Sequence, residues 1–172
     1  MILATQPNMP VPINKLVLSD IGPLIPATAL KRIADYVGKD IRFNSFEEFK
    51  QYMKVISASF GPLTEDQWHH MAIHSAREYE DGSYGFRYDP KISISFKERE
   101  ITDIDLWQQW DQLAIPTLVL RGTESDVLSI ETAAKMQVRG AKAKVVELPG
   151  IGHPPMIMDD HQIKIVRDFI LG

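Results

Sequence analysis

The sequence contains no cysteine among its 172 residues. Disulfide bonds, cysteine-based zinc sites and thiol catalysis are therefore excluded. A cysteine-free chain is compatible with the cytoplasm, where we expect this protein to reside. Positive charge is also scarce, because 19 lysine and arginine residues face 23 aspartate and glutamate residues, for a net charge of −4. Without a basic stripe, nucleic acid is not expected as a partner.

Long apolar runs are absent as well. No stretch approaches the roughly 20 apolar residues that span a bilayer, so no membrane partner is expected. Residues 1–12 lack the charged start and the long apolar centre of a secretory signal, and they resemble the end of a helix followed by a proline-rich loop. With 44% apolar and 24% charged residues, the composition is that of a soluble globular protein.

Three short apolar runs, at residues 15–20, 116–121 and 143–148, predict β-strands. Their nearly continuous apolar centres are typical of strands buried on both faces of a parallel sheet. Helices are predicted at 129–138 and at 160–171, the second with residues 163, 166, 169 and 170 on one apolar face. This strand–helix–strand–helix order predicts an α/β fold with right-handed crossovers.

The long segment between the first two strands is mostly helical in pattern. Helices are predicted at 28–37, 45–56, 64–73 and 105–113, and a short strand or extended loop at 84–88. Capping boxes are predicted at Ser45/Glu48 and at Thr64/Gln67. An insertion of this size should cover one end of the sheet. We therefore predict a core made of residues 1–22 and 114–172 and a helical cap made of residues 23–113.

Two loops carry the residues best suited to catalysis. Asp126 follows the strand at 116–121, and His153 follows the strand at 143–148 in the run Leu-Pro-Gly-Ile-Gly-His. The ends of parallel neighbouring strands lie at the same edge of a sheet, where open α/β sheets place their sites. We expect Asp126 to accept a hydrogen bond from His153 and to orient it as a general base. Glu124 is the rival acid.

These two loops resemble those of the α/β-hydrolase family. The run Pro-Thr-Leu-Val-Leu-Arg-Gly with Asp126 four residues on is similar to the family's acid loop, and the Gly-His loop is similar to its histidine loop. The run Lys-Leu-Val-Leu-Ser-Asp-Ile-Gly-Pro at 15–23 is similar to the strand after the nucleophile helix. The resemblance implies the C-terminal part of an α/β-hydrolase parallel sheet with a helical cap insertion.

The family's Gly-x-Ser-x-Gly nucleophile elbow is absent from the sequence. The resemblance implies that this elbow would lie roughly ten residues before Met1. We therefore predict a truncated serine hydrolase, inactive alone, whose parent protein cleaves an ester or related acyl bond of a small molecule. The open sheet edge would pair with the missing N-terminal half or with a second copy.

Other residues have competing interpretations. Trp107, Trp110 and Met156 are candidates for substrate contact, although aromatic residues at helical spacing more often belong to a core. Tyr36, Phe43, Phe60 and Trp68 are weaker candidates of the same kind. His70 and His74 share a helix face next to His69, but no third metal ligand is evident. We therefore expect no metal and no cofactor.

Two alternative functions stay open. Members of the same family act as lyases, dehalogenases or cofactor-free peroxidases, and the fold does not decide between these reactions. The chain could also be a non-catalytic binding or assembly module that buries its open sheet edge against a partner.

Overall fold

Strands β1 (Leu16–Ser19), β6 (Thr117–Gly122) and β7 (Lys144–Leu148) form a parallel sheet in the order β1-β6-β7. The computed structural model describes residues 1–6, 10–98 and 100–172. All three predicted strands are therefore confirmed, and the two strands that precede the Asp126 and His153 loops are direct neighbours. Helix α6 (Ile130–Val138) connects them, and α7 (Asp160–Leu171) follows β7.

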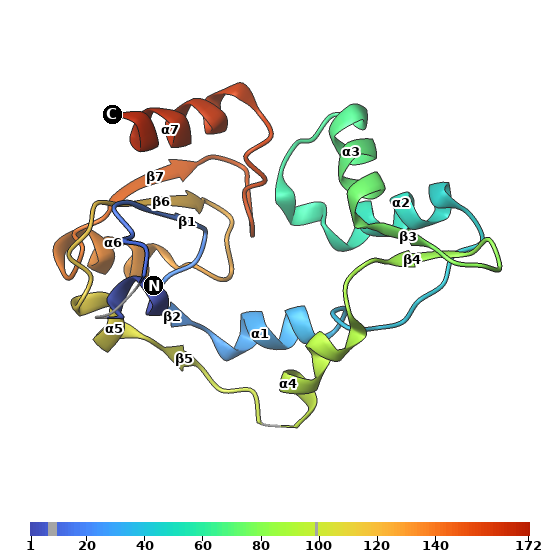
Figure 1. The fold of residues 1–172 in the computed structure, drawn as a ribbon, viewed down its shortest axis with the longest axis horizontal. Coiled ribbons are helices and arrows are strands. Elements are labelled where there is room, and N and C mark those ends of the chain that lie inside the picture. The colour runs from blue at the N-terminus through green and yellow to red at the C-terminus, as the bar shows by residue number, and fades with distance from the viewer. Residues whose placement is uncertain (7–9, 99) are drawn as a thin grey trace.

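The central strand β6 explains how the sheet is covered on both faces. All six of its residues are buried, and successive side chains point to opposite sides. Val119 packs with α6 and with α5 (Trp107–Asp111), whereas Leu118 and Leu120 pack under α7. The layers are visible in Figure 1, where α7 lies on one side of the sheet and α6 on the other.

Helix α7 differs in one respect from the prediction. Val166 and Phe169 pack on the sheet together with Ile165, but Ile163 and Ile170 are 44% and 51% exposed. The predicted apolar face therefore lies slightly rotated from the true one. Pattern alone does not fix which edge of an apolar stripe meets the sheet, because that depends on how the helix crosses it.

Apart from α5, the segment between β1 and β6 forms a second group of elements, whose helices α2 (Phe46–Ile56) and α3 (Glu65–Ser75) enclose a core of their own. The group also contains β2 (Leu24–Ile25), α1 (Ala27–Ala34), η2 (Ala58–Phe60), β3 (Ala76–Glu78), β4 (Tyr84–Phe86), η3 (Pro90–Ser93), α4 (Ile94–Lys97) and β5 (Ile104–Asp105). A short 3-10 helix, η1 (Ile2–Thr5), precedes β1. Phe49, Met53 and Trp68 lie at the centre of this second core.

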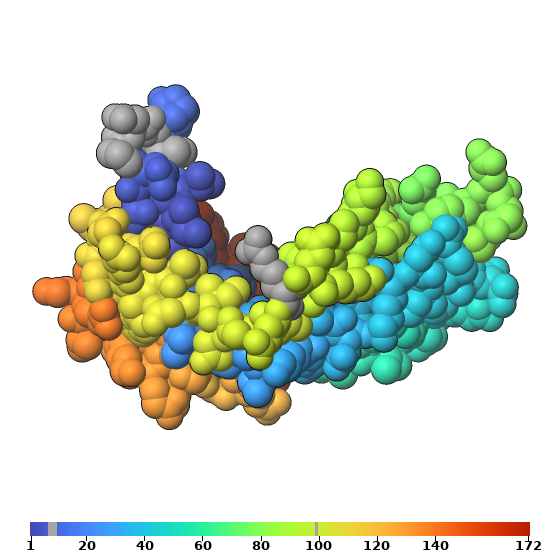
Figure 2. All heavy atoms as spheres, turned by 90° about the horizontal axis from the view of Figure 1, so that it is seen from below, coloured from blue at the N-terminus to red at the C-terminus, as the bar shows by residue number. Residues whose placement is uncertain are grey.

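We refer to residues 26–103 as the insertion, because the antiparallel pair β2–β5 closes its two ends. Figure 2 shows the insertion and the sheet as two masses joined by a narrower part of the molecule. The capping box at Thr64 and Gln67 is confirmed. At Ser45 only half of the predicted box forms, because Glu48 accepts from the amide of Asn44 instead. The boundaries predicted at residues 22 and 113 stay a prediction.

No helix among the described residues has both the length and the apolar character needed to cross a membrane.

Candidate active site

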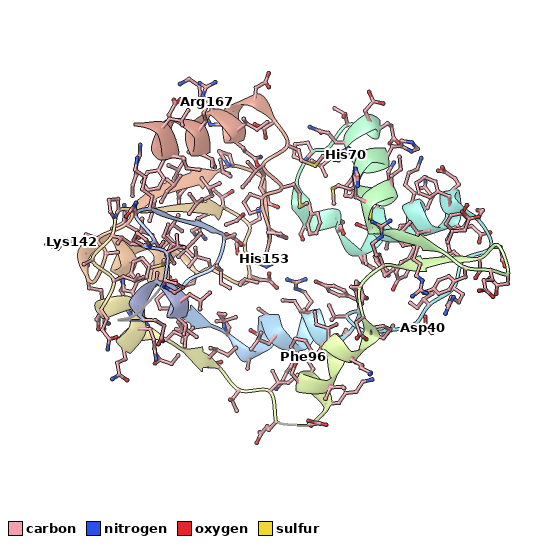
Figure 3. All side chains as sticks on the ribbon, viewed as in Figure 1. Asp40, His70, Phe96, Lys142, His153 and Arg167 are labelled. Atoms are coloured by element: carbon pink, nitrogen blue, oxygen red, sulfur yellow. The ribbon has the colours of Figure 1, made fainter. Side chains whose placement is uncertain are left out.

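His153 lies between the sheet and the insertion, in the loop that follows β7 (Figure 3). Its Nδ1 atom lies 2.9 Å from Oδ2 of Asp20 and 3.1 Å from the backbone oxygen of Asp20. A backbone oxygen can only accept a hydrogen bond, so Nδ1 carries the hydrogen. In the neutral ring, Nε2 is then the nitrogen with a free lone pair, as a general base requires.

Asp20 directly follows β1 and is completely buried. Its backbone has φ of 53°, a left-handed conformation that aspartate tolerates better than most residues. The carboxylate accepts from the amide of Gly122 at 2.9 Å, from the hydroxyl of Ser125, and from His153. These three hydrogen bonds come from the end of β6 and from the loops after β6 and β7.

Ser125 explains why the carboxylate points toward His153. Its hydroxyl oxygen accepts from the amides of Val127 and Leu128, at 3.1 and 3.0 Å. With its oxygen occupied in this way, the hydroxyl donates its own hydrogen to Oδ2 of Asp20. Ser125 thus connects the carboxylate of Asp20 to the loop after β6.

Asp126 does not occupy the place that the sequence predicted. Its carboxylate accepts two hydrogen bonds from the guanidinium of Arg32 on α1, with Nη2 at 2.8 Å from Oδ1. This bidentate contact raises the pKa of Arg32, chiefly through the hydrogen bonds to Asp126. The predicted hydrogen bond between Asp126 and His153 is therefore wrong, because Asp20 takes the histidine and Arg32 takes Asp126. The backbone amide of Glu124, the rival acid, donates to the backbone oxygen of Ile151 in the histidine loop at 2.9 Å.

Sequence reasoning missed Asp20, although a signal was present. Asp20 ends the first predicted strand, and that strand is the other neighbour of the strand before Asp126. Two acids therefore lie at the same edge of the sheet. The resemblance favoured Asp126, whereas the structure brings Asp20 into contact with His153.

The histidine loop and the loop after β6 approach very closely. A side chain at Gly122 would place its Cβ atom 2.2 Å from the oxygen of Ile151, so only glycine fits there. Gly152 lies similarly close to Ser59 of η2. The backbone oxygen of Ser59 accepts a hydrogen bond from the Gly152 amide at 2.7 Å. The Ser59 hydroxyl also donates to the oxygen of His153 at 3.0 Å. The insertion is thus tied directly to the loop that carries the histidine.

A cavity of about 600 Å³ lies between the insertion and the histidine loop. Pro154 and Met156, just after His153, form one wall. The rest of the wall comes from the insertion and is largely apolar, including Met53, Ile56, Phe60, Met71 and Phe86. Its size and lining are typical of a small-molecule site. Met156, a predicted substrate contact, therefore lines this cavity. Its contact with substrate stays a prediction.

The two tryptophans predicted to contact substrate lie elsewhere. Trp110 is completely buried in the core under β6, and its indole donates to the oxygen of Arg139 at 2.9 Å. Trp107 packs against the same core with the Arg139 guanidinium 4.3 Å from the centre of its ring. Neither lines the cavity, whereas the weaker candidates Tyr36 and Phe60 do. The competing interpretation of the tryptophans as core residues is the correct one.

A buried tryptophan in this position predicts a large effect on stability. We expect Trp110→Ala to lower the free energy of unfolding by about 3–5 kcal/mol, because it leaves a large cavity in the core. Val138→Ala on α6, at a position that is 73% exposed, should change it by less than about 0.5 kcal/mol. Urea denaturation of both variants measures the difference, and equal midpoints would contradict this placement of Trp110.

The histidines of α3 form a pair. The rings of His70 and His74 lie 4.5 Å apart, centre to centre. In the part of the chain that the structure describes, no group of three or more histidine, aspartate or glutamate residues is placed to hold a metal ion.

Comparison with known proteins yields several relatives, although no family model matches the chain. The chain is 38% identical over 169 residues to a 3-hydroxybutyrate-oligomer hydrolase of Cupriavidus necator, covering 94% of this chain and 58% of that protein. A protein of Rickettsia typhi described as a hydrolase superimposes with a TM-score of 0.87 at 28% identity, covering 98% of this chain and 56% of the other.

An α/β hydrolase of Novosphingobium aromaticivorans superimposes with a TM-score of 0.80 at 32% identity, covering 92% of this chain and 57% of the other. The chain thus spans a little over half the length of each of these three proteins.

Proposed function

Since the chain belongs to the α/β-hydrolase fold family, with the fold of the C-terminal part of such an enzyme, we propose that it supplies the base, the acid and the substrate cavity of a serine esterase. The observation that carries this proposal is the 2.9 Å contact between Nδ1 of His153 and the buried carboxylate of Asp20. A histidine fixed in one tautomer by a buried acid is the arrangement that activates a hydroxyl nucleophile.

In the proposed reaction, a serine from a segment outside this chain attacks the ester carbonyl. Nε2 of His153 takes the serine proton and then gives it to the departing alcohol, which leaves an acyl-enzyme. Water attacks the acyl-enzyme, Nε2 takes a proton from that water, and the serine recovers its proton as the acid product leaves. Asp20 keeps the ring oriented and stabilises the imidazolium in both steps.

The cavity beside His153 supports a small aliphatic substrate. Its wall is largely apolar and includes methionine, isoleucine and phenylalanine side chains, which contact hydrocarbon well. The relative from Cupriavidus necator bears the name of a 3-hydroxybutyrate-oligomer hydrolase. We therefore propose short esters of aliphatic hydroxy acids as the substrate class.

The missing serine also implies a structural partner. In the described part of the sheet, β1 pairs with β6 on one side only, so its other edge can accept a further strand. We propose that the segment with the nucleophile pairs along this edge. Its serine would then stand beside Asp20 and the histidine loop.

A hybrid enzyme tests this function. Residues 1–172 replace the region that they match in the Cupriavidus necator relative, and release of 3-hydroxybutyrate from its linear dimer is measured. We expect turnover by the hybrid and only background release by the isolated chain, since the chain has no nucleophile elbow. The chain co-expressed with the remaining part of the relative serves as a second format if the fusion does not fold.

Two outcomes would refute the proposal. One is a hybrid that unfolds cooperatively, and so is folded, but hydrolyses neither the dimer nor p-nitrophenyl butyrate. The other is an isolated chain that hydrolyses the dimer as fast as the hybrid does.

A further inference from the structure

The wall of the cavity is chemically mixed. Pro154 and Met156, from the histidine loop, place part of it next to His153. The part contributed by the insertion contains His74, at the end of α3, and Arg87, just after β4. These two residues are close in the fold, because the Arg87 amide donates to the oxygen of Ser75, the residue after His74, at 2.8 Å.

The charge on this wall is of one sign. The lining residues of the cavity include no aspartate and no glutamate. Among the described residues, ion pairs occupy Arg32, Arg42, Arg121, Arg139 and Arg167, whereas Arg77 and Arg87 have no carboxylate within 4.0 Å of their guanidinium groups. Arg87 lines this cavity and Arg77 does not, and Arg87 is exposed at the cavity wall. An exposed arginine at the wall of a largely apolar cavity, without an acidic partner, is suited to bind an anion from the ligand.

We propose that Arg87, assisted by His74, forms an anion subsite that binds a free carboxylate of the substrate while the ester lies at His153. This inference rests on the proposed esterase function and makes its substrate class more specific: aliphatic esters that carry a carboxylate at one end. An oligomer of a hydroxy acid has this chemistry, because one end of each chain is a carboxylic acid. The guanidinium binds the carboxylate through paired hydrogen bonds, and the apolar wall contacts the carbon chain between the two ends.

Binding to the chain itself tests the subsite independently of catalysis. The ¹⁵N-labelled 172-residue chain is titrated with butyrate and, separately, with neutral butyramide, and amide shifts are followed by NMR. We expect butyrate to bind with a dissociation constant on the order of 1 mM and to shift the amides around Ser75, Arg87 and Met156. Butyramide should bind at least about tenfold more weakly, because it lacks the charge that strengthens the hydrogen bonds to arginine.

Variants identify the residue responsible. Arg87→Met keeps an unbranched side chain and should weaken butyrate binding about tenfold or more, without changing butyramide binding. Arg167→Met is the matched control, since Arg167 is an exposed arginine on α7, far from the cavity (Figure 3), and it should leave butyrate binding unchanged. Equal binding of butyrate and butyramide, or equal effects of the two variants, would overturn the proposal.

Kinetics of the hybrid enzyme give the second readout. The 3-hydroxybutyrate dimer ends in a carboxylate, which its methyl ester replaces with a neutral group, and cleavage of the internal ester is followed in both by release of the first hydroxy-acid unit. Arg87→Met should raise KM about tenfold for the free acid, with little change in kcat, and leave the methyl ester unaffected. Loss of both activities in the variant would assign Arg87 a structural role and refute the subsite. An unsubstituted hybrid that hydrolyses neither compound would instead refute the esterase function, and the NMR result would still decide the anion subsite.

Discussion

Replacing His153 with alanine in the hybrid enzyme is expected to lower kcat for the 3-hydroxybutyrate dimer by about 10⁴-fold or more. The variant removes the only group proposed to take the serine proton, so the nucleophile stays a neutral hydroxyl. KM should change little, because the cavity is formed mainly by the insertion. Rates of dimer hydrolysis at saturating substrate measure this effect.

The control for this experiment is His161→Ala. His161 is exposed on α7 and does not line the cavity, so its loss should leave kcat within about twofold, as for a surface residue outside the site. Because the side chain of His153 is partly exposed, its removal should not unfold the protein. A folded His153→Ala variant that retains the rate of the unsubstituted hybrid would remove His153 from the mechanism.

The sheet could be predicted from sequence because its signals are local. The runs at 116–121 and 143–148 have nearly continuous apolar centres, and such runs bounded by turn residues have few other structures open to them. The helix between them follows from the cap at Ser129, whose hydroxyl accepts from the Thr132 amide. The position of His153 at the sheet edge followed from these elements alone.

The acid could not be assigned in the same way because the choice depends on contacts distant in sequence. Arg32, which binds Asp126, is 94 residues away from it, and Asp20 is 133 residues from His153. The left-handed backbone of Asp20 turns its side chain inward, and the apolar pattern of the strand before it does not indicate that conformation. The prediction that Trp107 and Trp110 contact substrate failed for a related reason. Helical spacing indicates that one face of a helix is buried, but it does not show which elements cover that face.

The ion pair between Arg32 and Asp126 has a structural explanation of its own. It joins α1 of the insertion to the loop after β6, and Val127 beside it packs with Ile25 and Ala29 in a small apolar cluster. Both charged side chains are substantially exposed, so their direct contribution to stability is small. The apolar cluster around Val127 therefore contributes more than the ion pair to holding α1 against the loop that contains Ser125, and Ser125 in turn donates to Asp20.

Assigning the acid to Asp20 or to Asp126 predicts opposite effects on kcat, and isosteric substitutions at the two positions distinguish the assignments. Asp20→Asn keeps the size of the side chain and a residue type that tolerates the left-handed backbone, so the fold should persist. It removes the carboxylate that stabilises the imidazolium, and an amide nitrogen in that position favours the wrong tautomer of His153. We expect kcat for dimer hydrolysis by the hybrid enzyme to fall about 10⁴-fold.

Asp126→Asn should lower kcat by less than about tenfold, since it weakens only an exposed ion pair at the edge of the insertion. Thermal unfolding of both variants confirms that each is folded, and steady-state kinetics on the dimer gives the comparison. If Asp126→Asn instead caused the larger loss and Asp20→Asn retained activity, then the acid of the mechanism would be Asp126. The contact between His153 and Asp20 would in that case be a structural contact, because a carboxylate that polarises the base cannot be dispensable while the base still works.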